Sequence, residues 1–124
     1  MTTRKIGIKS LEEVLQDTKE VMKKIERGEK VKPVKEPQVY FASFEAFRKA
    51  LTEQRLKIIK TIRKEHPASI YELAKIVGRD KKITFDDVQY LAQVGLIDLT
   101  KTKDGREKTT LRVNYESILL EIPV

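Results

Sequence analysis

Apolar residues recur at helical spacing in five parts of the chain. The first stripe begins at Ser10, which forms a capping box with Glu13, and Gly28 is the expected C-terminal stop. Its apolar side chains are spaced by three, four or seven positions: Leu11, Val14, Leu15, Val21, Met22 and Ile25. Such a stripe has to be covered by something. Two alternatives stay open, packing against the rest of the same chain or forming a dimer or partner surface.

Charge and proline separate this helix from the rest of the chain. Residues 4–8 alternate weakly and predict a short strand before the helix. Residues 28–37 contain two prolines among lysines and glutamates, which is typical of a linker. We therefore expect an N-terminal strand-helix extension with its linker over residues 1–37, and a second unit over residues 38–124.

The second unit begins with a predicted strand at 38–41 and two helices. Ser43 is the expected cap of a brief helix through residue 51, and Thr52 begins a longer one to about residue 65. His66 precedes Pro67 and ends that helix, because a residue before proline is pushed away from helical geometry. The buried face of the longer helix is expected to contain Leu56, Ile59 and Ile62, with Ile58 on its flank.

Two further helices are joined by a short turn. Ser69 and Glu72 form a second capping box, and Gly78 closes the helix that they open. Asp80 is the expected cap of the next helix, which runs to about residue 94 before Gly95 stops it. Two helices separated by a tight glycine-containing turn are typical of a helix-turn-helix.

The predicted helix 80–94 has two different faces. Its inward face contains Thr84, Val88, Leu91 and Gly95. Its outward face contains Lys82, Ile83, Asp86, Gln89, Tyr90 and Gln93. Those outward side chains would meet the major groove if this is a recognition helix. Phe85 lies on the flank, where a core position and a thymine-methyl contact are both open. Ala74, on the preceding helix, is small enough for the two helices to approach closely.

A β-hairpin is predicted directly after these helices. Residues 96–100 are extended, Asp104-Gly105 is a strong two-residue turn signal, and the return strand at 107–113 has Leu111 and Val113 on one face. Basic residues gather around its tip: Lys101, Lys103, Arg106 and Lys108. Exposed hairpins often carry lysine for solubility alone. The position after a helix-turn-helix instead favours phosphate contact and a winged-helix arrangement. The predicted fold is therefore α+β, mainly helical with a small sheet.

Composition narrows the function classes. The 124 residues have a formal net charge of +7, which suits an anionic partner. Absence of cysteine removes disulfides, thiolate metal sites and thiol nucleophiles, and the sole histidine is the helix-end His66. No phosphate-binding glycine loop is present, so we expect neither an enzyme nor a cofactor. Without a signal peptide or an apolar run of about 20 residues, we expect a cytoplasmic protein outside the membrane.

Residues 41–122 resemble the MarR/ArsR-like winged-helix transcriptional regulators, in particular a group of small predicted archaeal and bacterial regulators. The first matching motifs are Leu51-Thr52-x-x-Arg55-Leu56 and Ser69-Ile70-x-Glu72-Leu73-Ala74. The others are Val77-Gly78-Arg79-Asp80, Asp87-Val88-x-x-Leu91-x-x-x-Gly95-Leu96-Ile97 and Tyr115-x-x-Ile118-x-Leu120-x-Ile122. The resemblance implies binding to double-stranded DNA as a homodimer. Some members of the group act as antitoxin-like, self-regulating partners of a toxin.

The chain departs from this family at the outward face of the recognition helix. Relatives often carry basic or small polar residues where this chain has Ile83, Phe85 and Asp86. Residues 79–94 contain three basic and three acidic side chains, so affinity is expected to depend on the flanking bases and the wing. The expected DNA-binding residues are Arg79, Lys81, Lys82, Ile83, Phe85, Gln89, Tyr90, Gln93, Lys101, Lys103, Arg106 and Lys108.

The function predicted from these patterns is sequence-specific DNA binding by a dimeric repressor. Helix 80–94 would enter the major groove, and the hairpin at 97–113 would be the wing. The alternative is an antitoxin-like or scaffold module that binds a protein partner through its N-terminal helix, because winged helices also serve as protein-binding modules.

Overall fold

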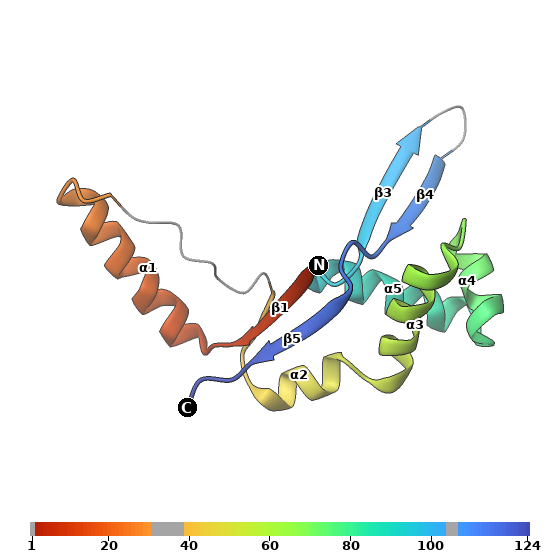
Figure 1. Ribbon diagram of the computed structural model, residues 1–124, viewed down its shortest axis with the longest axis horizontal. Helices are drawn as coiled ribbons and strands as arrows, with labels where there is room; N and C mark the ends of the chain where they lie inside the picture. Colours follow the sequence, from red (N-terminus) through yellow and green to blue (C-terminus); the bar gives the residue numbers. More distant parts are fainter. Residues whose placement is uncertain (1, 31–38, 104–106) are drawn as a thin grey trace.

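The structure is a computed structural model that describes residues 2–30, 39–103 and 107–124, with the backbone alone described at residues 102, 103, 107 and 108. Within these ranges the fold mixes helices and strands (Figure 1). The helices are α1 (Leu11–Glu26), α2 (Phe44–Ala50), α3 (Glu53–Glu65), α4 (Ile70–Val77) and α5 (Lys81–Val94). The strands are β1 (Thr3–Ile8), β2 (Val39–Phe41), β3 (Asp98–Lys103), β4 (Glu107–Arg112) and β5 (Ser117–Glu121).

Each helix begins at a side-chain cap, as the sequence predicts. A hydroxyl or carboxylate oxygen accepts a backbone N–H of the first turn, which satisfies one of the donors that a helix leaves free. The five capping residues are Ser10, Ser43, Thr52, Ser69 and Asp80. Glu72 adds to its box by accepting the backbone N–H of Ala68 at 3.1 Å. The starts of all five helices are therefore set by local chemistry.

The two ends of the chain meet in a three-stranded sheet of order β2-β1-β5. Both pairings are parallel, with Ile6 opposite Val39 on one side and opposite Leu120 on the other. The sequence predicts β1 and β2 but not β5. The division of the chain at residue 37 stays a prediction, but β1 lies with the second unit because it is the central strand of this sheet. Within the described residues 2–30, α1 is the element that extends away from the fold.

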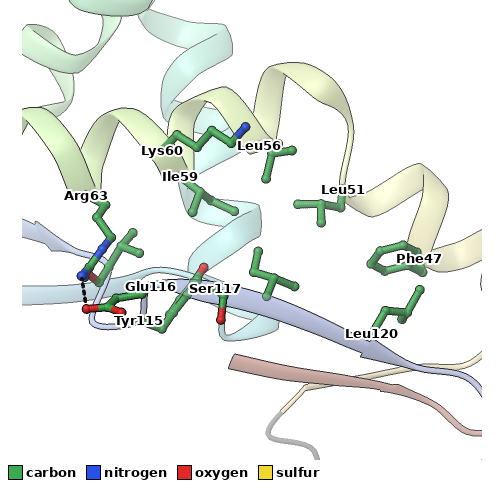
Figure 2. Close-up of a pocket in the computed structure, with 12 residues that line it drawn as sticks. Phe47, Leu51, Leu56, Ile59, Lys60, Arg63, Tyr115, Glu116, Ser117 and Leu120 are labelled. Atoms are coloured by element: carbon green, nitrogen blue, oxygen red, sulfur yellow. Dashed lines mark hydrogen bonds and ion pairs between the residues drawn. The ribbon is translucent and has the colours of Figure 1, made fainter. Parts of the chain in front are cut away.

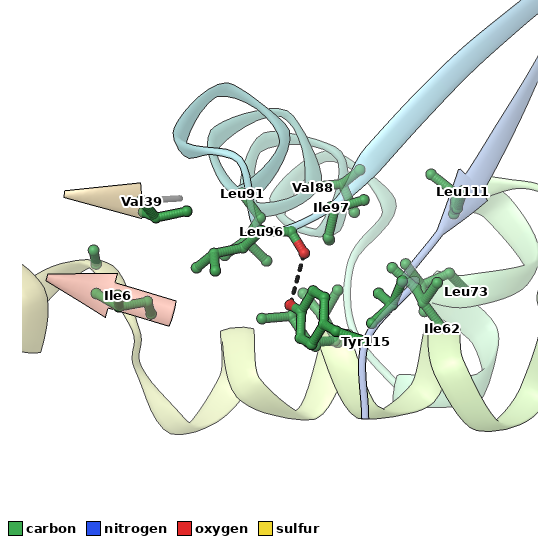
Figure 3. Packing of buried hydrophobic residues seen from close by; sticks show 14 of the residues in the cluster. Ile6, Val39, Ile62, Leu73, Val88, Leu91, Leu96, Ile97, Leu111 and Tyr115 are labelled. Atoms are coloured by element: carbon green, nitrogen blue, oxygen red, sulfur yellow. Dashed lines mark hydrogen bonds between the residues drawn. The ribbon is translucent and has the colours of Figure 1, made fainter. Parts of the chain in front are cut away.

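One apolar core joins this sheet to the helices α2, α3, α4 and α5 (Figure 3). Ile6 from β1, Ile62 from α3, Leu73 from α4 and Leu91 from α5 are all fully buried in it. The expected positions Leu111 and Val113 are also buried, so the hairpin is attached through one of its faces. The same core therefore holds α5 and the hairpin in fixed relative positions.

Tyr115 connects the segment before β5 to the end of α5. Its buried phenol donates a hydrogen bond to the carbonyl oxygen of Leu96 at 2.7 Å (Figure 3). Burial raises the pKa of Tyr115 to about 12, while the nearby Arg4 guanidinium acts in the opposite direction. The phenol therefore stays protonated at neutral pH and remains a hydrogen-bond donor.

Helix α1 projects away from the sheet on the side opposite α4 (Figure 1). None of its sixteen residues is buried, and Leu11 is 70% exposed. An ion pair between Lys9 and Asp17 fixes the first turns of the helix to the end of β1. Of the two alternatives for the apolar stripe, packing against the same chain is not observed with the described residues. No helix among the described residues is both long and apolar enough to cross a membrane.

Candidate nucleic-acid interface

The turn between α4 and α5 has the geometry that the glycine spacing predicts. Gly78 has a φ of 70°, a left-handed conformation that glycine adopts without strain. The N–H of Arg79 donates to the carbonyl of Ala74, which closes the end of α4. Ala74 is buried, as the close approach of the two helices requires. Because the connection between α4 and α5 is so short, this turn determines the direction of α5 relative to α4.

Helix α5 buries one face and exposes the other. Thr84, Val88 and Leu91 are fully buried, which confirms the predicted inward face. The opposite face is exposed over its length, at Lys82, Ile83, Asp86, Gln89 and Gln93. Ile83 and Phe85 remain 47% and 46% exposed. The flank position Phe85 is therefore not part of the core.

An ion-pair cluster on the flank of α5 neutralises part of its charge. Asp87 accepts a hydrogen bond from Arg55 Nε at 3.1 Å and lies 4.0 Å from Arg79. Asp80 is engaged in the cap, accepting the N–H groups of Lys82 and Ile83. Asp86 is therefore the acidic side chain of α5 that faces outward.

Tyr90 differs from the prediction. The helical wheel places it on the outward face, but it is half-buried against the core. The Arg55 guanidinium lies over its ring, 4.2 Å from the centroid. Because α3 covers this position, Tyr90 is a packing residue on the flank rather than part of the exposed face.

The β3–β4 hairpin stands beside α5 and forms a groove with it. The hairpin is antiparallel, with Thr100 opposite Thr110, and it extends away from the core (Figure 1). The groove has a volume of about 840 Å³, and its walls are mostly polar. Gln89 and Gln93 line it from α5, whereas Thr100 and Arg112 line it from the strands. Hydrogen-bonding side chains of α5 and of the hairpin therefore line the same concave surface.

The predicted basic residues of the hairpin are only partly described. Lys101 is exposed on β3. Arg106 and the Asp104-Gly105 turn lie outside the described residues, as do the side chains of Lys103 and Lys108. Arg112, which the sequence analysis did not single out, is exposed at the base of the hairpin. Its position after Leu111 on the alternate face of β4 is the signal that could have identified it.

A second feature that the sequence analysis missed lies on α4. Tyr71 is exposed, and two ammonium groups approach its ring, Lys75 at 4.6 Å and Lys81 at 5.3 Å. Lys75 follows Tyr71 by four positions, the spacing at which neighbours on a helix surface meet. The start of α5 and the outer face of α4 therefore form one basic patch, which contains Lys75, Lys81 and Lys82.

The six residues of the α1 stripe lie apart from this interface. All of them are exposed, and three line a small hollow with Tyr40, namely Val14, Val21 and Met22. Among the residues that the structure describes, no group of three or more acidic or histidine side chains is placed to hold a metal ion.

Comparison with known proteins places the chain in one family. The model of the HVO_A0114 family matches residues 50–120, which is more than half of the chain. This range runs from the end of α2 through the hairpin and most of β5, so it includes every element of the interface described above. No curated protein and no solved structure matches the chain. The chain therefore belongs to the HVO_A0114 family.

Proposed function

We propose that α3, α4, α5 and the β3–β4 hairpin act as a winged helix-turn-helix that binds double-stranded DNA, as in MarR/ArsR-like regulators. The protein acts as a homodimeric transcriptional regulator, with α5 in the major groove and the hairpin as the wing. The observation that carries this proposal is the polar groove between α5 and the hairpin. Gln89 and Gln93 on one wall and Arg112 on the other suit base edges and phosphates.

Charge supports the same proposal. The basic patch on α4 and α5 lies where the first turns of a recognition helix pass the DNA backbone. Asp87 is paired with Arg55 and Arg79, and Asp80 accepts backbone N–H groups in the cap, so neither carboxylate forms an ion pair with Lys81 or Lys82. Asp86 remains outward, where it accepts a hydrogen bond from a cytosine amino group or repels phosphate.

The test is a salt titration of binding to duplex DNA, using a mixed-sequence duplex and the DNA upstream of the protein's own gene. We expect the logarithm of the binding constant to fall steeply with the logarithm of salt concentration, because neutralised phosphates release counterions. Replacing Lys81 and Lys82 together by alanine should weaken binding to both duplexes. It should also reduce the salt slope by about 2, because each lysine that neutralises a phosphate contributes about 1.

The matched control replaces Lys23 and Lys24 of α1 by alanine. These two lysines are exposed, and their replacement changes the net charge by the same amount at a distance from α5. The control should bind like the wild type. Binding that does not respond to salt, or equally weakened binding by both double variants, would contradict the proposed interface.

The exposed stripe on α1 favours a second function, binding of a protein partner in the manner of an antitoxin or scaffold. An amphipathic helix with an uncovered apolar face suits a hydrophobic groove on another protein. Removing residues 1–37 is not a suitable test, because the truncation also removes the central strand β1.

Substitutions on α1 test this second function without disturbing the sheet. We expect a partner that copurifies with the wild type to be absent with Leu15→Lys and Met22→Lys, because both place a charge in the stripe. Glu20→Lys changes the opposite face of the helix and should retain the partner. Equal recovery with all of these variants would exclude α1 as the binding surface.

A further inference from the structure

Strand β5 has a free edge. It pairs with β1 on one side, and β1 is its only partner strand among the described residues. Alternate N–H and C=O groups of β5 therefore point away from the sheet, which is a template for pairing with another chain. Natural edge strands are commonly protected by charged side chains, above all lysine, or by proline. Residues 117–121 contain no lysine and no proline, and their one charged residue is Glu121 at the end of the strand. The opposite edge strand, β2, is only three residues long.

An apolar cleft lies beside β5 (Figure 2). It has a volume of about 530 Å³ and separates β5 from α2 and α3. No residue of β1 or β2 is among the described residues that line it, so the cleft lies toward the β5 side of the sheet. Its apolar walls include Phe47, Leu51, Leu56, Ile59, Ile118 and Leu120. Figure 2 shows Phe47 and Leu51 on the helical wall across from Leu120.

The other face of the strand has one exposed apolar side chain between Ser117 and Glu121. Leu119 points away from the cleft and is 51% exposed. A strand with a free edge and an exposed apolar side chain is prone to associate. The exposed surface that a partner would bury is therefore β5 together with the cleft.

We infer that a second copy of this chain covers it, with the two β5 strands paired antiparallel about a two-fold axis at Leu119. This register places Ile118 opposite Leu120 of the second copy and Glu121 opposite Ser117 of the second copy. No like charges face each other, and the strand is complementary to itself. The two three-stranded sheets become one sheet of six strands.

The same symmetry closes the cleft. A two-fold axis perpendicular to the sheet keeps α2 and α3 of both copies on one side of it, so the two clefts face each other across the joined strands. Pairing of two short strands is marginally stable in water by itself. Contact along the apolar rims of the two clefts adds apolar burial to the strand pairing.

This inference rests on the proposed function, which requires two copies, and names the surface that joins them. Its test uses no DNA, so either idea can fail without the other. A protein that binds DNA through α5 but does not dimerise through β5 would overturn the inference alone.

The first test measures the molar mass of the full-length chain by sedimentation or light scattering over a range of concentrations. We expect a dimer for the wild type and a single chain for Leu119→Lys, because the substitution places two ammonium groups directly opposite each other at the axis. Leu15→Lys is the matched control, since Leu15 on α1 is 53% exposed and Leu119 is 51% exposed. It should remain dimeric.

A cysteine cross-link tests the register and does not depend on Leu119→Lys folding. The chain contains no cysteine, so Leu119→Cys introduces a unique thiol. Directly opposite residues of antiparallel strands have Cα atoms about 4.5–5.5 Å apart, within the span of a disulfide. Mild oxidation should convert Leu119→Cys, but not Leu15→Cys, into a covalent dimer. A monomeric wild type, a dimer broken by Leu15→Lys, or cross-linking only through Leu15→Cys would overturn the inference.

Discussion

Replacing Leu91 by alanine is expected to lower the free energy of unfolding by about 2–5 kcal/mol. Leu91 is fully buried on the inner face of α5, in the same apolar cluster as Leu73 and Leu96. The truncation removes part of this apolar packing and leaves a cavity at the position where α5 is fixed to the fold. Since a domain of this size is stable by only about 5–15 kcal/mol, this decrease is a large part of the total.

Urea denaturation followed by circular dichroism measures this effect. The control is Ile83→Ala on the exposed face of the same helix, where we expect a change within about 0.5 kcal/mol. Equal decreases in stability for the two variants would show that the buried and exposed faces of α5 are assigned wrongly.

Replacing Arg55 by alanine is expected to lower the free energy of unfolding by about 2–3 kcal/mol, within the range for hydrogen bonds to charged groups. Its guanidinium donates to Asp87 at 3.1 Å and to the carbonyl oxygens of Ala50 at 2.9 Å and Lys49 at 3.3 Å. It also covers the ring of Tyr90. Arg55 therefore joins the end of α2 and the start of α3 to α5.

A double-mutant cycle with Asp87→Ala separates this interaction from the general cost of truncation. We expect a coupling energy of about 0.5–3 kcal/mol, because the two side chains are in direct contact. Arg55→Lys should not restore stability, since a compact ammonium lacks the planar guanidinium that donates to both Asp87 and Ala50 and covers the Tyr90 ring. Arg48→Ala, on the exposed face of α2, is the control. Additive effects of the two truncations would contradict the proposed link.

The position of the candidate interface was largely predictable from the sequence, but its composition was less so. Lys82, Gln89 and Gln93 lie outward as the helical wheel predicts, because the wheel depends only on the geometry of one helix. The helical wheel placed Tyr90 wrongly, because a wheel uses the geometry of one helix alone. It does not include Arg55 of α3, which lies over the Tyr90 ring. Arg112 was missed for a similar reason, since it joins α5 only through the groove.

The structural features that the sequence determined by itself are local ones. Hydroxyl and carboxylate caps, glycine stops and apolar spacing act within one or two turns, so the starts of α1 to α5 and the buried face of α5 follow from them. Only the tertiary structure decided that β1 lies between β2 and β5 and that the described part of the chain leaves the apolar stripe of α1 exposed. The reason is that Thr3 and Ser117 meet across more than a hundred residues. A strand's alternation specifies which face is buried, but not which strand will be its neighbour.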